Sequence, residues 1–209
     1  AIGLRLTCRR LFGLHRWLLP FLFILRYISL PAFLPAQMAR NALGSGIQLV
    51  SASAVVPHPD KAGRKYELPP NCGGEDAFFI EDEAGVVGVA DGVGGWASQG
   101  VDPGLFSREL MAFAAEEARA LQPGKVEPKE LLQRAHGRTR ALGSSTAIIA
   151  ALQWNGAGKQ GLSLRVANLG DSGMLVLRGS KILFQTKPQQ HSFNFPYQLG
   201  APGRGAGGD

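Results

Sequence analysis

Acidic residues stand next to apolar, strand-like runs at two places in the chain. Glu75 and Asp76 come directly before the run AFFIE at residues 77–81, and Asp91 comes directly after the run VVGVA at residues 86–90. If these runs pair as an antiparallel hairpin, the start of one strand lies beside the end of the other, and the carboxylates gather at one edge of the sheet. Carboxylates at such close range repel one another unless a cation is bound among them.

These side chains suit a hard divalent cation. Mg²⁺ and Mn²⁺ prefer oxygen ligands, and Mg²⁺–oxygen distances are about 2.0–2.1 Å. Gly92, which follows Asp91, leaves its backbone carbonyl accessible as a further oxygen ligand. The alternative interpretation is that the acids are ordinary turn residues, because Asp-Gly is a common turn pair after a strand. Taken one at a time, each acid is better explained by a turn than by catalysis.

The surrounding pattern predicts the elements that must position these acids. The two apolar runs read as strands joined by an acidic turn over residues 81–85. Asp102 and Pro103 predict a helix start, with Asp102 as the N-cap and Pro103 at the first helical position, and apolar residues continue at helical spacing to Leu121. A second helix is expected to begin near Pro128.

A run of strands is expected after the helices. Apolar segments separated by turn sequences predict strands at residues 146–152, 162–168, 173–178 and 181–185. Strands, then two helices, then more strands indicate an α+β domain built in layers. The glycine-rich end, residues 200–209, is expected to be a flexible tail.

The distribution of charge argues against a nucleic-acid-binding protein. The net charge is +6, but residues 1–59 hold six arginines and no acid, whereas residues 60–209 hold 16 basic and 16 acidic residues. A nucleic-acid binder usually carries its basic patch on the folded domain. The two cysteines, Cys8 and Cys72, provide neither a disulfide framework nor zinc-ligand spacing, which favours a reducing compartment.

The first 45 residues have the composition of an organelle-targeting leader. They are rich in arginine and apolar residues and lack acids, as transit peptides do. Residues 17–34 are apolar enough to make a membrane anchor the competing interpretation, although Pro20, Arg26 and Pro31 interrupt the run. A third interpretation is upstream translated sequence that does not belong to the protein.

Four segments together resemble successive motifs of the metal-dependent serine/threonine protein phosphatases of type 2C (the PPM family). In chain order they are GGEDA at 73–77, VADGVGG at 89–95, GSSTA at 143–147 and ANLGDSG at 167–173. Two further stretches resemble the organellar members of mitochondria and plastids, namely residues 92–111 and 193–199. One such motif is a weak signal, whereas four in the family's order over about residues 44–199 are a specific one.

The resemblance implies a fold and a set of metal ligands. The fold is a four-layer α/β/β/α sandwich of two antiparallel sheets flanked by helices, formed by residues 46–199 and incomplete at its C-terminus. Asp91 is similar to the catalytic carboxylate that bridges two metal ions, and Gly92 would give its carbonyl to one of them. Glu75 and Asp76 would act with Asp91 as ligands or hold metal-bound waters, and Asp171 would help to bind a further, weaker ion.

The implied activity is the hydrolysis of phosphoserine and phosphothreonine in proteins by a water activated at two or more Mg²⁺ or Mn²⁺ ions. The resemblance thus implies a phosphoprotein substrate, and we expect a monomer that binds no nucleic acid. The leader would allow association with a membrane. The chloroplast is the favoured compartment, and the mitochondrion is the alternative.

Two departures from the family pattern keep a second hypothesis open. Val93 stands where many members have a histidine proposed as the general acid; His191 lies in the right broad region, but a packing role is the simpler interpretation. The family's later metal-binding aspartates have no counterpart, since Asp209 is the only acid after Asp171. The second hypothesis is therefore a truncated, non-catalytic pseudophosphatase that acts as a binding protein. A cysteine phosphatase is disfavoured because the chain has no Cys-x5-Arg tract and because an acidic stretch, GGED, follows Cys72 and would raise the pKa of a thiol there.

Overall fold

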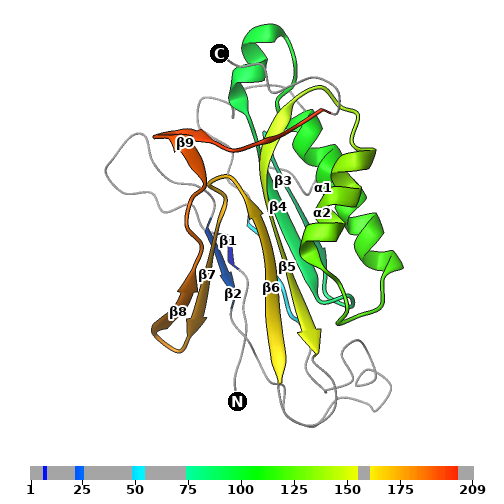
Figure 1. The fold of residues 1–209 in the computed structure, drawn as a ribbon, viewed down its shortest axis with the longest axis vertical. Helices are drawn as coiled ribbons and strands as arrows, with labels where there is room; N and C mark the ends of the chain where they lie inside the picture. Colours follow the sequence, from blue (N-terminus) through cyan, green and yellow to red (C-terminus); the bar gives the residue numbers. More distant parts are fainter. Residues whose placement is uncertain (1–6, 9–21, 26–48, 55–73, 155–160, 202–209) are drawn as a thin grey trace.

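The structure is a computed structural model that describes residues 7–8, 22–25, 49–54, 74–154 and 161–201 (Figure 1). Its helices are the 3₁₀ helix η3 (Gly94–Gln99), α1 (Gly104–Ala120) and α2 (Pro128–Arg138). Its strands are β1 (Thr7–Cys8), β2 (Leu22–Leu25), β3 (Asp76–Glu81), β4 (Val86–Gly92), β5 (Ser144–Trp154), β6 (Leu162–Leu169), β7 (Gly173–Arg178), β8 (Lys181–Gln185), β9 (Gln190–Ser192), β10 (Phe195–Pro196) and β11 (Leu199–Gly200).

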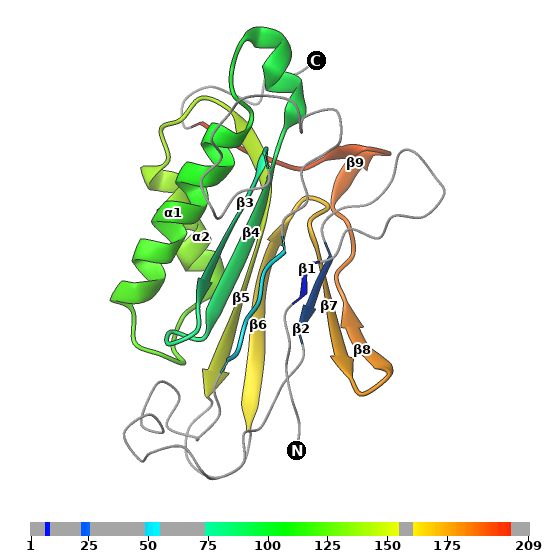
Figure 2. The ribbon, with the colours of Figure 1, turned by 180° about the vertical axis from the view of Figure 1, so that it is seen from behind.

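The described elements form three layers. The helices α1 and α2 cover one face of a sheet in which β11, β5, β4 and β3 are neighbours and β6 also pairs with β5 (Figures 1 and 2). A second sheet, in the order β1-β2-β7-β8, lies beside the opposite face. Its β2–β7 pairing is parallel, whereas its other two pairings are antiparallel. The layers agree with the expected α/β/β/α sandwich, of which the second helical layer is not among the described residues.

The long central strand β5 borders two apolar clusters, and its side chains alternate between them. This alternation follows from the two-residue period of a strand. Ile149 is fully buried in the cluster beneath the helices, and its neighbour Ile148 is 3% exposed in the cluster between the sheets. Met174 of β7 belongs to this second cluster and Val176 packs against it, so the two sheets pack through apolar side chains. Burial of each large apolar side chain stabilises the fold by about 1.5–3 kcal/mol.

The expected hairpin of β3 and β4 is confirmed. The strands are antiparallel, with Ala77 opposite Ala90, and each runs a residue or two longer than expected. The turn between them closes with a hydrogen bond from the Gly85 N–H to the Asp82 carbonyl at 3.1 Å. Gly85 has a φ of +71°, a left-handed conformation that glycine adopts without the penalty of a side chain.

The two expected helices are also present. Assigned from Gly104, α1 has Pro103 at its N-cap, where Asp102 had been expected; Asp102 nevertheless accepts the Gly104 N–H through Oδ1 at 2.9 Å. Phe106 and Leu110, one turn apart, are completely buried against the sheet. The second helix, α2, begins with a proline at its first position, as expected.

Arg138 joins the end of α2 to α1. Its guanidinium donates to Glu116 and, at 2.8 Å, to Glu117, and it lies 4.2 Å from the centre of the Phe113 ring. The hydrogen bonds to Glu116 and Glu117 raise the pKa of Arg138 above its ordinary value. Since these groups are on the surface, their contribution to stability is small.

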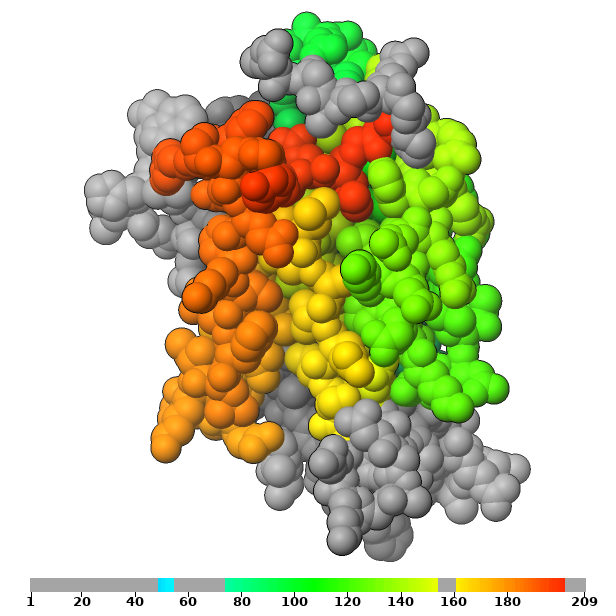
Figure 3. All heavy atoms as spheres, viewed as in Figure 1, coloured from blue at the N-terminus to red at the C-terminus, as the bar shows by residue number. Residues whose placement is uncertain are grey.

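A groove runs along the outer side of β6. Figure 3 shows the residues of this strand lying deep between α2 and the segment that follows β8. The groove has a volume of about 670 Å³ and is lined by Leu132, Val166, Phe184 and Leu199 among others. Beside it, β8 is the last strand of its sheet among the described residues, and all of its side chains are exposed.

The strands expected after the helices are confirmed, whereas the expected leader and tail lie largely outside the described residues. The four strands expected after the helices correspond to β5–β8, whereas η3 and the short strands β9–β11 were not expected. The leader over residues 1–45 lies outside the described residues apart from β1 and β2, and the tail does so from residue 202. None of the helices formed by described residues has the length and apolar character needed to cross a membrane.

Candidate functional site

Asp76 and Asp91 face each other across β3 and β4. They are register partners, and the Gly92 N–H donates to the Glu75 carbonyl at 3.0 Å. This bond joins Glu75 and Gly92, the next pair along the ladder. Because hydrogen-bonded and non-hydrogen-bonded pairs alternate, Asp76 and Asp91 form a non-hydrogen-bonded pair. Cα atoms in such a pair are about 4.5 Å apart, closer than in a hydrogen-bonded pair. The hairpin therefore places two carboxylates side by side, as the sequence predicted.

Both carboxylates lie on the face of the sheet that the second sheet covers. Val89 in β4 belongs to the cluster between the sheets, and Phe78 in β3 packs against it. Asp76 lies two residues before Phe78, and Asp91 lies two residues after Val89, so both acids share that face at the two-residue period of a strand. Thr146 of β5 is the next residue in this cross-strand row, since it pairs with Asp91. The acids thus stand at the end of the space between the two sheets, where both are partly exposed.

The Glu75 carboxylate reaches the loop that follows β4. A side-chain carbon placed on Gly94 would lie 3.2 Å from its Oε2 and 3.3 Å from its Oε1. Gly94 opens η3, directly after Asp91, Gly92 and Val93. The structure therefore brings Glu75 to the same end of the hairpin as Asp76 and Asp91, although it comes from the segment before β3.

Gly92 occupies a place that no larger residue can fill. A side-chain carbon at this position would overlap the Pro103 carbonyl oxygen and would lie 2.5 Å from the Glu75 carbonyl oxygen. Both obstacles are backbone atoms, so they cannot move aside as a flexible side chain could. The close packing brings the end of β4 against both the start of β3 and the start of α1.

Asp171 lies at the same end of the sheet, in the connection between β6 and β7. Ala147 pairs with both Leu169 and Ala90, so the ends of β6 and β4 are level. Because β5 lies between them, about 10 Å separates the two strands. The Asp171 carboxylate accepts a hydrogen bond from Gln190 Nε2 at 3.1 Å. In the part of the chain that the structure describes, no three acidic, histidine or cysteine side chains converge as one ligand set.

The oxygen atoms available at this site are ligands of the type that a hard cation prefers. Mg²⁺ is commonly held by one or two carboxylates together with water and substrate oxygens. The in-register pair Asp76 and Asp91 supplies two carboxylates, and the Gly92 carbonyl and the Glu75 carboxylate are close in the chain or in space. These four residues could therefore hold Mg²⁺ or Mn²⁺, and Asp171 stands two strands away from Asp91, on the other side of β5.

A hydrogen-bonded bridge that the sequence did not reveal holds η3 over this end of the sheet. The Trp96 indole N–H donates to Ser144 Oγ at 2.8 Å, and Ser144 Oγ donates to Gln198 Oε1 at 2.8 Å. The Val93 N–H adds a bond to the Ser144 carbonyl at 2.9 Å. The only signal in the sequence was that these residues fall in the motif segments 92–111, 143–147 and 193–199.

His191 packs against aromatic neighbours. Its ring centre lies 3.9 Å from that of Tyr197 and 5.4 Å from that of Phe195. This arrangement agrees with the simpler interpretation of His191 as a packing residue. Val93, at the position where many phosphatases of the resembling family have histidine, is half-buried and offers no titratable group.

The chain is similar to known protein phosphatases. No protein-family model matches the chain. It is 47% identical over 154 residues to the probable protein phosphatase 2C 80 of Arabidopsis thaliana, a match that covers 73% of this chain and 34% of the relative. It is 41% identical over 137 residues to the protein phosphatase PTC7 homolog fig of Drosophila virilis, covering 62% of this chain and 42% of the relative.

A solved structure has the same fold over most of the chain. The photosystem II phosphatase PBCP superposes with a TM-score of 0.57 at 42% sequence identity, over 72% of this chain and 54% of that one. The chain thus spans about a third of the length of the Arabidopsis relative and about half of the solved phosphatase.

Proposed function

Because this chain belongs to the protein phosphatase 2C family, we propose that residues 46–199 form the larger part of a metal-dependent serine/threonine phosphatase domain. The proposed reaction is hydrolysis of phosphoserine and phosphothreonine at a dinuclear Mg²⁺ or Mn²⁺ site. The observation that carries the proposal is the in-register pair of Asp76 and Asp91 at the end of the space between the sheets.

In this proposal each residue at the site has a defined task. Asp91 would be the shared ligand, because it stands in the middle of the cross-strand row with Asp76 on one side and Thr146 on the other. Glu75 would add a carboxylate from the loop side, and Gly92 its carbonyl. When bound, the ions would supply an activated water and positive charge against the phosphoryl group.

Asp171 would serve a separate, weaker ion. Its carboxylate lies at the same end of the sheet, and Gln190 fixes the direction of one oxygen. A second site about two strands away could contact a phosphoryl group or its water without sharing the Asp76–Asp91 ligands.

The decisive experiment removes the central carboxylate. Phosphate release from a phosphothreonine peptide would be measured in Mn²⁺ for the wild-type protein, for Asp91→Ala and for Glu83→Ala. Glu83 is an exposed acid in the turn at the other end of the same hairpin. We expect Asp91→Ala to abolish release and Glu83→Ala to leave it unchanged. Near-wild-type turnover by Asp91→Ala would contradict the proposal.

A non-catalytic binding protein is the second candidate. It is favoured by the small number of carboxylates that the described residues bring together. This candidate predicts that the phosphopeptide binds, in a titration followed by fluorescence anisotropy, while no phosphate is released at any Mn²⁺ concentration.

The compartment and substrate are proposed from the relatives. The solved relative is described as a photosystem II phosphatase. We therefore favour a phosphoprotein of the chloroplast as substrate, and the mitochondrion is the alternative. Immunoblots of purified chloroplasts and mitochondria with an antibody against residues 181–201 would separate the two.

A further inference from the structure

The backbone just before β3 is fixed by three hydrogen bonds, two of them from side chains of α1. Ser107 Oγ donates to the Glu75 carbonyl at 2.5 Å, and the same carbonyl accepts the Gly92 N–H at 3.0 Å. Ser107 is completely buried, although it carries a hydroxyl. The same hydroxyl lies 3.0 Å from the Gly104 carbonyl of its own helix. It therefore links α1 to the Glu75 backbone while satisfying the hydrogen-bonding need of a buried hydroxyl.

Arg108 contacts Gly74, the residue before Glu75. Its guanidinium donates to the Gly74 carbonyl at 3.1 Å through one nitrogen and forms an ion pair with Asp102 through the other. Asp102 also accepts the Gly104 N–H at 2.9 Å, so the ion pair is anchored to the first turn of α1. The rigid fork of a guanidinium can make both contacts at once, which a lysine ammonium cannot do with the same geometry.

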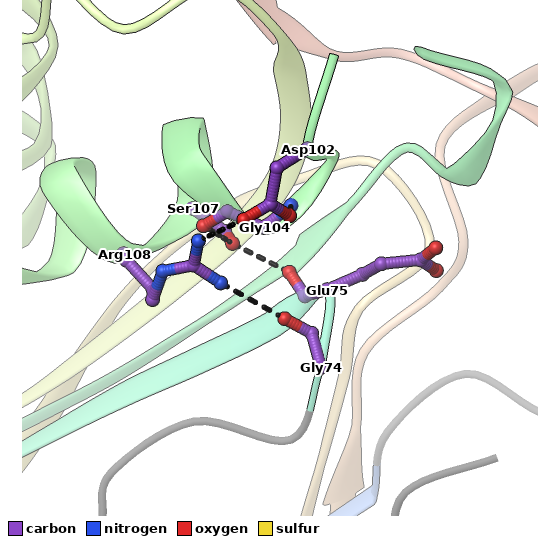
Figure 4. Close-up of polar contacts among 6 residues, drawn as sticks. All are labelled: Gly74, Glu75, Asp102, Gly104, Ser107 and Arg108. Atoms are coloured by element: carbon purple, nitrogen blue, oxygen red, sulfur yellow. Dashed lines mark hydrogen bonds and ion pairs between the residues drawn. The ribbon is translucent and has the colours of Figure 1, made fainter. Parts of the chain in front are cut away.

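The Glu75 carboxylate lies on the side away from this contact. Figure 4 shows the Glu75 side chain extending away from Arg108, whereas its carbonyl and that of Gly74 face the helix. Arg108 contacts the Gly74 carbonyl and Asp102, so its hydrogen bond to this segment is made to the backbone. Gly104 permits this close approach, because a side-chain carbon there would overlap both Arg108 and the Gly74 carbonyl.

We propose that Ser107 and Arg108 are positioning residues for the metal site. They clamp the Gly74–Glu75 backbone, and so they set where Glu75 and the first strand residue, Asp76, stand relative to Asp91. This inference rests on the proposed metal site and assigns it a support on α1. Residues that orient metal ligands typically change metal affinity 10- to 100-fold when they are replaced.

Metal affinity, rather than stability alone, tests this role. Binding of MnCl₂ would be measured by isothermal titration calorimetry at 25 °C for the wild-type chain and for Ser107→Ala, Arg108→Ala and Arg108→Lys, each verified as folded by circular dichroism. The matched control is Arg138→Ala, which removes an arginine that bridges α1 and α2 far from the hairpin end. We expect Ser107→Ala and Arg108→Ala to weaken Mn²⁺ binding about tenfold or more, Arg108→Lys to be intermediate, and Arg138→Ala to match the wild type.

The possible results separate this role from the proposed function. Wild-type affinity in a folded Arg108→Ala would overturn the positioning role even if Ser107→Ala failed to fold. Because the Arg108 side chain is largely buried, at 20% exposure, Arg108→Lys, which keeps the charge and much of the packing, takes the place of Arg108→Ala if that variant does not fold. Equal weakening by Arg138→Ala would also overturn it, since the effect would then be a general one on helix packing. A wild-type chain that binds no Mn²⁺ would overturn the proposed metal site itself.

Discussion

Gly92 and Pro103 touch so closely that the end of β4 and the start of α1 leave no room for a side chain between them. A carbon added to Gly92 would overlap the Pro103 carbonyl, and the Glu75 carbonyl lies 2.5 Å from the same point. We expect Gly92→Ala to destabilise the protein by about 1–3 kcal/mol or more, because overpacking against backbone forces the elements apart. Urea unfolding would measure this loss.

The control for that substitution is three residues away. A carbon added to Gly95 has its nearest neighbour, Val93 Cγ1, at 4.0 Å, an ordinary contact distance. Gly95→Ala should therefore change the free energy of unfolding by less than about 1 kcal/mol. Equal effects of the two substitutions would show that the close contact at Gly92 is unimportant.

Neutralising one carboxylate of the Asp76–Asp91 pair should remove the stabilisation that a bound cation provides. A ligand at 100 times its dissociation constant stabilises the folded state by about 2.7 kcal/mol. Addition of Mn²⁺ should therefore raise the melting temperature of the wild type, and EDTA should reverse the rise. Asp76→Asn should show little or no rise, whereas Glu83→Gln, at the exposed turn, should respond as the wild type does. An unaltered Mn²⁺ response in Asp76→Asn would remove Asp76 from the site.

The bridge between Trp96 and Ser144 should contribute a measurable coupling energy. The indole N–H and the hydroxyl oxygen are 2.8 Å apart. Trp96→Phe, Ser144→Ala and the double substitution form a double-mutant cycle in which the loss of one partner removes the bond. We expect a coupling of about 0.5–1.5 kcal/mol from thermal or urea unfolding, the usual net value of a hydrogen bond. Strictly additive effects would mean that this bond does not hold η3 in place.

The exposed edge of β8 should promote self-association, in contrast to the monomer expected from the sequence. Ile182, Leu183 and Phe184 are 61%, 51% and 49% exposed on a strand whose outer edge has no partner among the described residues. Exposed apolar edge strands pair readily with other chains, and an added lysine blocks such pairing. Leu183→Lys should therefore shift a concentration series in analytical ultracentrifugation towards monomer.

A matched substitution in the same strand separates edge pairing from net charge. Gln185→Lys adds the same charge at another exposed position of β8 but removes no apolar side chain. It should leave most of the association in place. If both substitutions abolish association equally, general charge repulsion is the cause.

Much of the fold was predictable because its signals are local. The short apolar runs at residues 77–81 and 86–90 and the acidic turn between them predict the β3–β4 hairpin, and the antiparallel register then brings Asp76 opposite Asp91. The start of α2 was also predictable, because proline is favoured at the first helical position.

The features that were not predictable depend on contacts between distant residues. The 3₁₀ helix η3 is held by a bond from Trp96 to Ser144, 48 residues further along the chain. The contact of Ser107 with the Glu75 carbonyl spans 32 residues and involves a backbone atom, which leaves no mark on residue type. The strands β10 and β11 have only two residues each, too few to show a period.

The side chains of β5 alternate between the two faces of the sheet, so this one strand contributes residues to both apolar clusters. A slip of this strand by one residue would turn Ile148 and Ile149 to each other's side and spoil both clusters together. The helical layer and the second sheet therefore cannot loosen independently, and unfolding should be a single cooperative event. Since Thr146 of the same strand pairs with Asp91, such a slip would also change the residue that stands beside the aspartates.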